Sequence, residues 1–364
     1  MSERGSSRPE PKGDAARLLL ASARARFSAA ASDFLLPQQA RLTEWQRLTA
    51  AALLLDLVGG IEGTLRATLA AAFAEHDALH AALSSPRVAI ALPILDRAEA
   101  LRDAELGTVL VRRVEEHRYW KDNASADLLL TALAGDADPA LAADATALLV
   151  ARSRRFDRFQ EPMIGHSDLP AELHHRLVWN VAAALRHYVV QHHAIAPGVA
   201  DGAIAGAAAA MVAGYDEGGT LEACAMRLAA RLLPAGRLEG SDLAAMLEEG
   251  MLPLFLAGIA ARCALDYAAA WEILSDPDGR GSALLLRAAR IGREDAALIL
   301  LLLNARGQLF SSEEGDAAAA QLAAYDATDA AAAVDVLRLW QVDPGYRAAI
   351  GRLSTRRRSA SEAA

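Results

Sequence analysis

The chain has 364 residues, of which 53% are hydrophobic, 23% charged and 5% aromatic, and its formal net charge is −9. The apolar content excludes a disordered chain, two cysteines cannot build a disulfide-rich scaffold, and the negative charge argues against general nucleic-acid binding. The length fits two domains or one long array of helices.

The first segments have helical spacing. Residues 1–13 are polar, lack the apolar core of a signal peptide and are expected to be a disordered tail. An amphipathic helix is predicted over residues 15–34, ending before Pro37. Another is predicted over residues 43–57, with Thr43 as its N-cap.

Glycines and prolines punctuate the next stretch. Gly59 and Gly60 are expected to end the second helix, and a third is expected to reach about residue 82. Residues 87–95 are rich in β-branched and aliphatic side chains, as strands are. We predict a helix there because the neighbouring segments are helical.

Residues 124–152 form a helix, turn and helix unit in the sequence pattern. Gly135-Asp-Ala-Asp-Pro139 is the turn, and Pro139 suits the first turn of the following helix. HEAT-type repeats have this appearance, and residues 92–113 are a degraded candidate for a second copy. Such pairs stack because one pair alone cannot bury its apolar face.

Residues 151–170 mark the clearest boundary. Arg152, Arg154, Arg155 and Arg158 lie close together there, followed by prolines and a glycine. An acidic partner could bind this arginine cluster, but a solvated linker is the favoured interpretation. The predicted regions are therefore residues 14–152, a polar linker at 153–170, and a helical domain at 171–353.

Helices continue to the end of the second region. Residues 251–274 are apolar nearly all round and are expected to form one buried helix. Residues 354–364 are expected to be a disordered tail. The remaining predicted helices cover residues 171–192, 198–213, 220–233, 283–291, 294–305, 317–325, 331–340 and 345–353.

From Phe156 to about residue 350 the chain resembles a bacterial family known as domain of unknown function 2336. The resemblance implies an all-α, repeat-like fold and no activity. The residues that carry it are Asp168-Leu-Pro-Ala-Glu-Leu-His174, Leu177-Val-Trp-Asn-Val-Ala-Ala-Ala-Leu-Arg186, Tyr215-Asp-Glu-Gly-Gly-Thr-Leu-Glu-Ala223, Ala225-Met-Arg-Leu228, residues 254–261, and residues 266–287 with Ser275-Asp-Pro-Asp-Gly-Arg-Gly281.

The sequence contains no recognisable catalytic motif. It has no phosphate-binding loop, no G-x-S-x-G elbow and no cysteine pair at zinc spacing. Residues 276–287 resemble a calcium loop, but Arg280 and Arg287 occupy positions that require oxygen ligands. We interpret this segment as a turn between helices, and we predict no catalytic residue, cofactor or metal.

Histidine is unevenly distributed, because six of the nine lie between His166 and His193. On a helix, His174 falls at the edge of an apolar stripe and does not share a face with His187. His76 and His80 have the spacing of a ligand pair. A metal site in either place is the less favoured interpretation, and solvated or edge histidines are expected.

Trp179 points away from the apolar stripe of Leu173, Leu177 and Val181. A central helix with Trp179 packed under a neighbour is the favoured interpretation. The alternative is an exposed interaction patch, since Trp and Arg dominate interface hot spots. This candidate patch consists of Trp179, Arg186, Arg176, Asn180 and His187.

The predicted fold class is all-α, with HEAT-like or α-solenoid-like helix pairs. The predicted function is a non-enzymatic scaffold or regulatory adaptor that binds an unknown protein partner. Two alternatives stay open: a metal-binding sensor or enzyme that uses residues 166–193, and a structural homo-oligomer formed through helices rich in Ala and Gly.

The sequence also suggests a compartment. Cys224 and Cys263 are each expected to be reduced core residues, which favours the cytoplasm. The longest apolar runs, residues 203–214 and 296–303, are too short to cross a membrane. Neither nucleic acid nor a membrane is expected as a partner, and the arginines at 356–358 are too few to anchor either.

Overall fold

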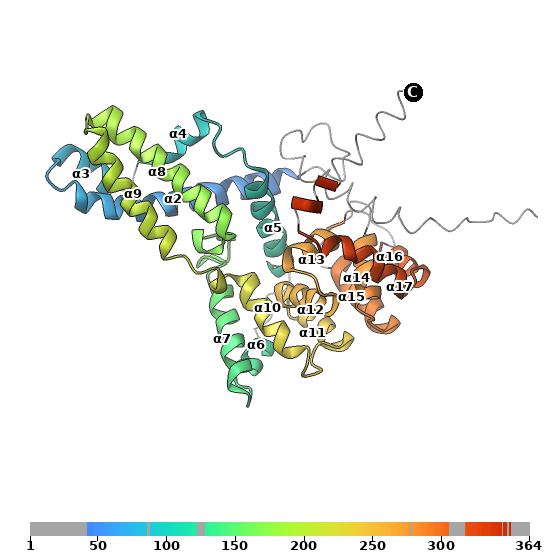
Figure 1. The fold of residues 1–364 in the computed structure, drawn as a ribbon. Coiled ribbons are helices and arrows are strands. Elements are labelled where there is room, and N and C mark those ends of the chain that lie inside the picture. Colours follow the sequence, from blue (N-terminus) through green and yellow to red (C-terminus); the bar gives the residue numbers. More distant parts are fainter. Residues whose placement is uncertain are drawn as a thin grey trace, which may run out of the picture. The chain divides into compact units, whose positions relative to one another are not determined.

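The structure is a computed structural model that describes residues 42–85, 88–121, 128–276, 279–305, 317–343, 345–347 and 349–350. Every regular element in these ranges is a helix (Figure 1). One isolated antiparallel bridge joins Phe156 and Pro162. The predicted all-α class is thereby confirmed for the described part of the chain.

Several predictions concern other parts of the chain. The two predicted tails, the predicted helix at 15–34 and the arginines at 356–358 lie outside the described residues. The last predicted helix, at 345–353, is described only in part.

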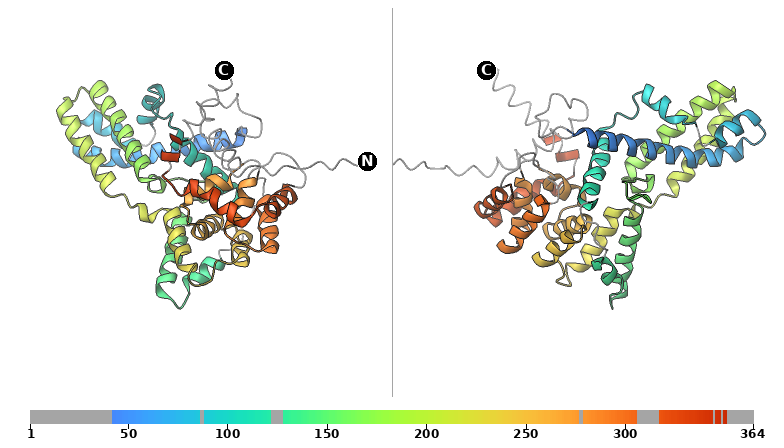
Figure 2. Two further views of the ribbon diagram at one scale, coloured as in Figure 1. Left: turned by 45° about the vertical axis from the view of Figure 1, so that its right-hand side comes forward. Right: turned by 180° about the vertical axis from the view of Figure 1, so that it is seen from behind.

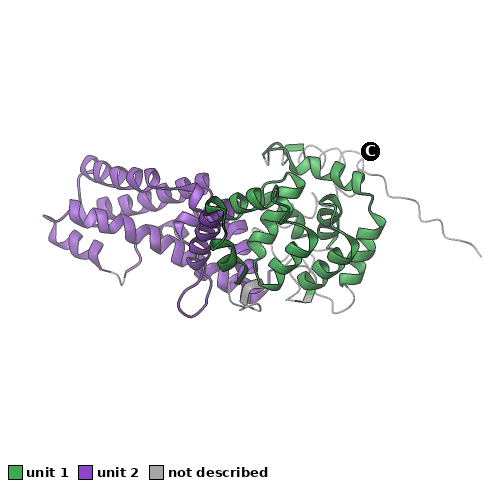
Figure 3. Cartoon of the chain, turned by 90° about the horizontal axis from the view of Figure 1, so that it is seen from below, with its two compact units in different colours: residues 1–41, 119–141, 225–364 green, residues 42–118, 142–224 purple. Residues whose placement is uncertain are grey.

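The chain divides into two compact units, coloured separately in Figure 3. Unit 1 comprises residues 1–41, 119–141 and 225–364, and unit 2 comprises residues 42–118 and 142–224. Each unit is therefore assembled from segments that are distant in sequence. The sequence-based division at residues 153–170 stays a prediction.

Unit 2 is built around its longest helix, α2 (Glu44–Ala72), which packs against α3, α4, α8 and α9. In Figures 1 and 2, α8 and α9 run side by side as neighbouring helices, and they are joined by residues 194–196. The other helices are α3 (Asp77–Ser84), α4 (Ala91–Arg97), most of α5 (Ala104–Lys121), most of α7 (Pro139–Ser153), η4 (His166–Asp168), α8 (Ala171–His193), α9 (Pro197–Ala213), η5 (Glu217–Gly219) and the first turn of α10 (Leu221–Leu232).

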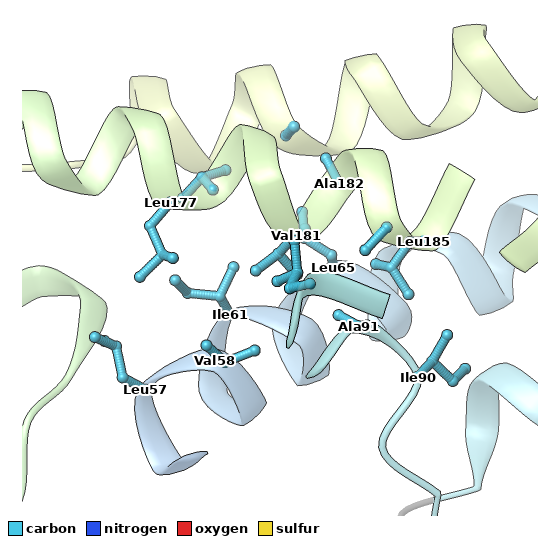
Figure 4. Close-up of a cluster of buried hydrophobic side chains, with 14 of the residues drawn as sticks. Leu57, Val58, Ile61, Leu65, Ile90, Ala91, Leu177, Val181, Ala182 and Leu185 are labelled. Atoms are coloured by element: carbon cyan, nitrogen blue, oxygen red, sulfur yellow. The ribbon is translucent and has the colours of Figure 1, made fainter. Parts of the chain in front are cut away.

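The core of unit 2 lies between α2 and α8. Side chains of both helices interdigitate there, and α4 closes the core from one side (Figure 4). This burial explains the spacing of the apolar residues in both segments. The labelled core residues are Leu57, Val58, Ile61, Leu65, Ile90, Ala91, Leu177, Val181, Ala182 and Leu185.

The start of α2 follows the sequence pattern, but its length does not. Thr43 is the N-cap, as predicted, and it forms a capping box with Gln46: Gln46 N–H donates to Thr43 Oγ1 at 3.2 Å, and Thr43 N–H donates to Gln46 Oε1 at 2.6 Å. The predicted end at Gly59 and Gly60 is wrong, because α2 continues to Ala72. Each glycine costs a helix about 1 kcal/mol, and burial of the leucines and isoleucine around them offsets that cost.

Unit 1 contains α6 and the helices that follow residue 225. Here α11 packs against α12 and α15, and α14 packs against α13, α16 and α17. Its helices are α6 (Leu128–Ala134), most of α10 (Leu221–Leu232), α11 (Gly240–Glu248), α12 (Leu252–Cys263), α13 (Tyr267–Leu274), α14 (Arg280–Ala288), α15 (Arg293–Ala305), α16 (Ala317–Ala327), α17 (Ala330–Leu337) and η6 (Arg338–Trp340).

The single helix predicted over residues 251–274 is wrong, because the chain turns by 104° between α12 and α13. Ala264 has a left-handed backbone (φ 52°), which ends α12. Asp266 then caps α13 by accepting a hydrogen bond from Ala269 N–H at 2.6 Å. One long buried helix and two short buried helices joined by a tight turn are both apolar on all sides. The spacing of apolar residues therefore cannot tell the two arrangements apart.

One helix of the described residues, α2, is long and apolar enough to cross a membrane. The bent pair α12 and α13 passes the same test if it is counted as one span. Core helices of soluble proteins can be equally long and apolar. The sequence analysis did not find this span, because it divided the segment into two shorter helices at Gly59 and Gly60.

Candidate interaction surface

Helix α8 positions the candidate patch. Leu173, Leu177, Val181 and Leu185 recur every four residues and are buried, so the opposite side of the helix is turned outward. Trp179, Arg176, Arg186 and His187 are all exposed on that side, and Asn180 is half-buried at its edge. The structure therefore brings the five predicted patch residues together on one helix; we call them the α8 patch.

Trp179 is 36% exposed, whereas the favoured sequence interpretation packed it under a neighbour. That interpretation is wrong, because more than a third of the Trp179 side chain is exposed on the side of α8 opposite Leu173, Leu177 and Val181. The indole is nevertheless held in place. Its Nε1–H donates to His175 Nε2 at 3.0 Å, one helical turn earlier.

Both arginines of the α8 patch are held in ion pairs. The Nη2 atom of Arg176 lies 2.8 Å from Asp103 Oδ2 and 2.7 Å from Glu105 Oε2. Arg186 forms a bidentate pair with Asp201 on α9. Its hydrogen bonds raise the pKa of Arg186 and lower the pKa of Asp201. These pairs are exposed and add little stability, but they orient both guanidinium groups.

The outward side of α9 adds a surface of small residues beside the patch. An added Cβ at Gly202 or Gly206 would meet nothing within 4 Å, and Ala205 and Ala209 are exposed. Because α8 and α9 are packed neighbours, the combined face presents one large aromatic group next to a flat, small-residue surface. Such a face can accept another helix at close range.

Unit 2 also contains a buried network of charged side chains. Arg155 is 3% exposed and lies 3.0 Å from Glu222 Oε2, 3.7 Å from Asp168 Oδ1 and 3.9 Å from Glu116 Oε2. Arg112 also contacts Glu222, with Nη2 2.7 Å from Oε1. The network joins α5, the segment before α8 and the first turn of α10.

The sequence did not identify this network. Arg152 and Arg155 were expected in a solvated linker, but they are 7% and 3% exposed. Arg113 donates through Nε to the carbonyl of Met163 and through Nη2 to that of Arg155, which fixes the loop onto α5. The signal in the sequence was the density of charged residues at 112–118, where three arginines and two glutamates occur within seven residues.

Charge balance inside the network shifts its pKa values. Burial and the neighbouring Arg155 lower the pKa of Arg113 to about 10. Burial alone would raise the pKa of Glu222, but Arg155 and Arg112 more than compensate and lower it. Buried ions need such pairing, because an uncompensated buried charge is strongly destabilising. We therefore assign the network a structural role.

A stack of aromatic rings lies next to the network. His174 is 1% exposed, and its ring lies 4.3 Å from that of Tyr215 and 5.3 Å from that of His166. The expected edge position of His174 is thus wrong, because Tyr215 covers it. Burial, with His166 and His175 nearby, lowers the pKa of His174 to about 4. Burial raises the pKa of Tyr215 to about 12.

The two histidine groups of the sequence do not form a metal site in the described residues. No group of three or more His, Cys, Asp or Glu side chains is arranged there to hold an ion. His76 precedes α3 as its N-cap, and His80 Nδ1 is 2.9 Å from the carbonyl of Ala70. The two residues of this less favoured ligand pair therefore do not both lie within α3.

Comparison with known proteins gives one result. A family described as an uncharacterised protein conserved in bacteria (DUF2336) matches residues 125–338, well over half of the chain. The chain belongs to the DUF2336 family. No curated protein and no solved structure matches it. The DUF2336 match includes α8 and therefore the whole α8 patch.

Two motifs quoted for the DUF2336 resemblance form turns. In the first, Asp216 Oδ1 accepts from Gly218 N–H at 3.0 Å, and Thr220 Oγ1 accepts from Ala223 N–H at the start of α10. In the second, Asp276 Oδ2 accepts from the N–H groups of Arg280 and Gly281. The second motif is a turn between helices, as predicted.

Proposed function

We propose that this DUF2336 protein is a non-enzymatic scaffold or regulatory adaptor that binds a protein partner through the α8 patch. The observation that carries the proposal is the exposed indole of Trp179, with Arg176 and Arg186 held in place on the same side of α8. Binding needs little further ordering of these side chains, and such preorganisation favours affinity.

The finer architecture also belongs to this proposal. The predicted helix, turn and helix at α6 and α7 is present, with Asp138 Oδ1 accepting from Ala140 N–H at 2.9 Å as an N-cap. We propose that such helix, turn and helix segments are HEAT-like repeat units. In unit 1, α11 packs against α15, although the two helices are distant in sequence.

The remaining parts of the proposal concern partners and compartment. We propose a cytoplasmic protein that binds neither nucleic acid nor a membrane. Cys224 and Cys263 are buried and form no disulfide, which supports a reducing compartment. The buried ion pair of Glu62 and Arg66, with Nη1 2.9 Å from Oε1, supports α2 as a core helix.

Affinity capture from the native cell tests the proposal. The full chain is compared with a Trp179→Ala, Arg186→Ala double variant. The control is Phe159→Ala with Arg158→Ala, which removes another exposed aromatic and arginine pair of unit 2. We expect the first variant to lose a partner that the wild type and the control retain. Retention of every partner by a folded patch variant would contradict the proposal.

The metal-binding sensor or enzyme would use residues 166–193, and no specific observation favours it. The ring of buried His174 stacks on Tyr215 and lies tilted against that of half-buried His166, and His175 accepts from Trp179. Elemental analysis of the purified protein checks this alternative directly. Bound zinc, iron or manganese at one ion per chain would favour the alternative over the scaffold.

A further inference from the structure

The first half of α2 presents an exposed apolar stripe that faces away from the core. Trp45, Leu48 and Leu55 are 43%, 65% and 51% exposed, and Ala52 and Gly59 are also exposed. These five residues, which we call the α2 stripe, follow one another at intervals of three and four. That spacing keeps them on one side of a helix and is the spacing of a coiled-coil seam.

The stripe itself is uncharged and flat at one end. Gly59, Gly60 and Gly63 are exposed, and a Cβ added at any of them would meet nothing within 4 Å. The nearest charged residues, Glu44 and Asp56, are displaced by about 60° around the helix from the centre line of the stripe, on opposite sides. Exposed leucines and a tryptophan in an uncharged line are typical of a surface that another helix covers.

The positions along the stripe are nearly symmetric about Ala52, and the side chains at its two ends are complementary in size. Leu48 lies four residues before Ala52 and Leu55 three residues after it, while bulky Trp45 and Gly59 each lie seven residues away. A two-fold axis at Ala52 would therefore place each Trp45 against the flat surface at the partner's Gly59. Interfaces of this isologous type require such self-complementarity.

We propose that the α2 stripe is a self-association surface on which a second copy of this chain docks, with the two α2 helices antiparallel. In this register each Leu48 packs against the partner's Leu55. Like charges stay apart: with a rise of 1.5 Å per residue, the two Asp56 carboxylates are separated by about 12 Å along the axis and the two Glu44 carboxylates by about 24 Å.

This inference goes beyond the α8 patch and does not depend on it. The α2 stripe and the α8 patch lie on different helices, so a dimer joined by α2 carries two α8 patches. A scaffold that presents two copies of a binding surface gains avidity for a repeated partner. The dimer would thus increase the binding strength of the proposed adaptor.

The mass of the full chain in solution is the test. We expect the wild type to sediment as a dimer, and a Leu48→Asp, Leu55→Asp variant to sediment with half that mass. Leu301→Asp is the matched control, because Leu301 is 55% exposed on α15 outside the stripe. A single-chain mass for the wild type at every concentration, or an intact dimer in the stripe variant, would overturn the proposal.

A size exchange tests the antiparallel register. Gly59→Trp alone should weaken the dimer, because it places two indoles opposite each other. Trp45→Gly combined with Gly59→Trp should restore it, because each large side chain again meets a glycine. Open space around Gly59 means that the protomer can accept the new side chain. Failure of the double variant to regain the dimer would reject the register.

Other occupants of the stripe would be recognised in the same experiments. A wild-type monomer whose stripe variant gains accessible apolar surface, measured by dye binding, would indicate cover by residues 1–41. Binding of the wild type, but not the stripe variant, to phosphatidylcholine vesicles would indicate a lipid surface. Either result would reject the second copy as the occupant.

Discussion

The guanidinium group of Arg155 lies 3.0 Å from the carboxylate of Glu222, although the two residues are 67 positions apart in the chain. Arg155 is buried, and Glu222 is largely buried with it. The pair ties the loop before α8 to the first turn of α10. It thereby fixes the end of the helix that carries the α8 patch.

Loss of the Arg155 guanidinium should strongly destabilise unit 2. In an Arg155→Met variant, the carboxylates of Glu222, Glu116 and Asp168 lose a shared counterion. Removal of one partner from a buried ion pair costs about 3–5 kcal/mol. Chemical denaturation followed by tryptophan fluorescence measures this loss. Arg154→Met is the control, since Arg154 is exposed and donates to the carbonyl of Gly219.

The advantage of the wild type over Arg155→Met should depend on pH. The folded state lowers the pKa of Glu222 below its usual 4.5. The stability from its charged form is therefore fully present above about pH 4.5, and it is lost as the pH falls through the lower pKa of the folded state. Denaturation at several pH values checks this. An equal difference between the two proteins at pH 7 and pH 3 would contradict the assignment.

His174 should make the protein less stable in mild acid. Its pKa falls from 6.5 to about 4 on folding, so between these values the unfolded state binds a proton that the folded state does not. Stability therefore rises with pH across this window, by up to roughly 3 kcal/mol at 1.4 kcal/mol per pKa unit. His174→Phe keeps an aromatic ring beside Tyr215 and should remove this contribution. Parallel curves of stability against pH for the two proteins would contradict the prediction.

Two helical glycines should respond oppositely to alanine. A Cβ at Gly281 would lie 1.8 Å from the carbonyl oxygen of Ile273, so Gly281→Ala must displace backbone. We expect a loss of about 2 kcal/mol or more, within the usual range for overpacking. At Gly206 the space is open, and Gly206→Ala should stabilise α9 by up to about 1 kcal/mol. Thermal denaturation of both variants is the measurement, and equal effects would refute the packing argument.

The segment after residue 338, where the family match ends, should be part of the fold of unit 1. Trp340 is 1% exposed, and Arg347 lies over its ring while pairing with Glu272 on α13. Trp340→Ala should cost about 3–5 kcal/mol. Tyr346→Ala is the control, because Tyr346 is 61% exposed. Chemical denaturation is the measurement. If both variants have the same denaturation midpoint as the wild type, Trp340 has no packing role.

The sequence predicted α8 and α9 almost to the residue, because α8 has one apolar side, α9 is dense in alanine, and a proline marks the start of each helix, Pro170 and Pro197. The same reasoning failed at Gly59 and at Ala264. Local propensity indicates a helix end at a glycine pair and a continuous helix at an alanine. In both places the packing of neighbouring helices, which a single segment does not reveal, outweighed local propensity.

The sequence by itself determined the all-α class, the helix caps and the set of residues on the outward side of α8, because these depend on spacing along one helix. The tertiary structure alone decided that Trp179 is exposed, that Arg155 is buried against Glu222 and that His174 is covered by Tyr215. Exposure and charge pairing depend on which distant segment packs alongside, and that is set by the free energy of the whole fold.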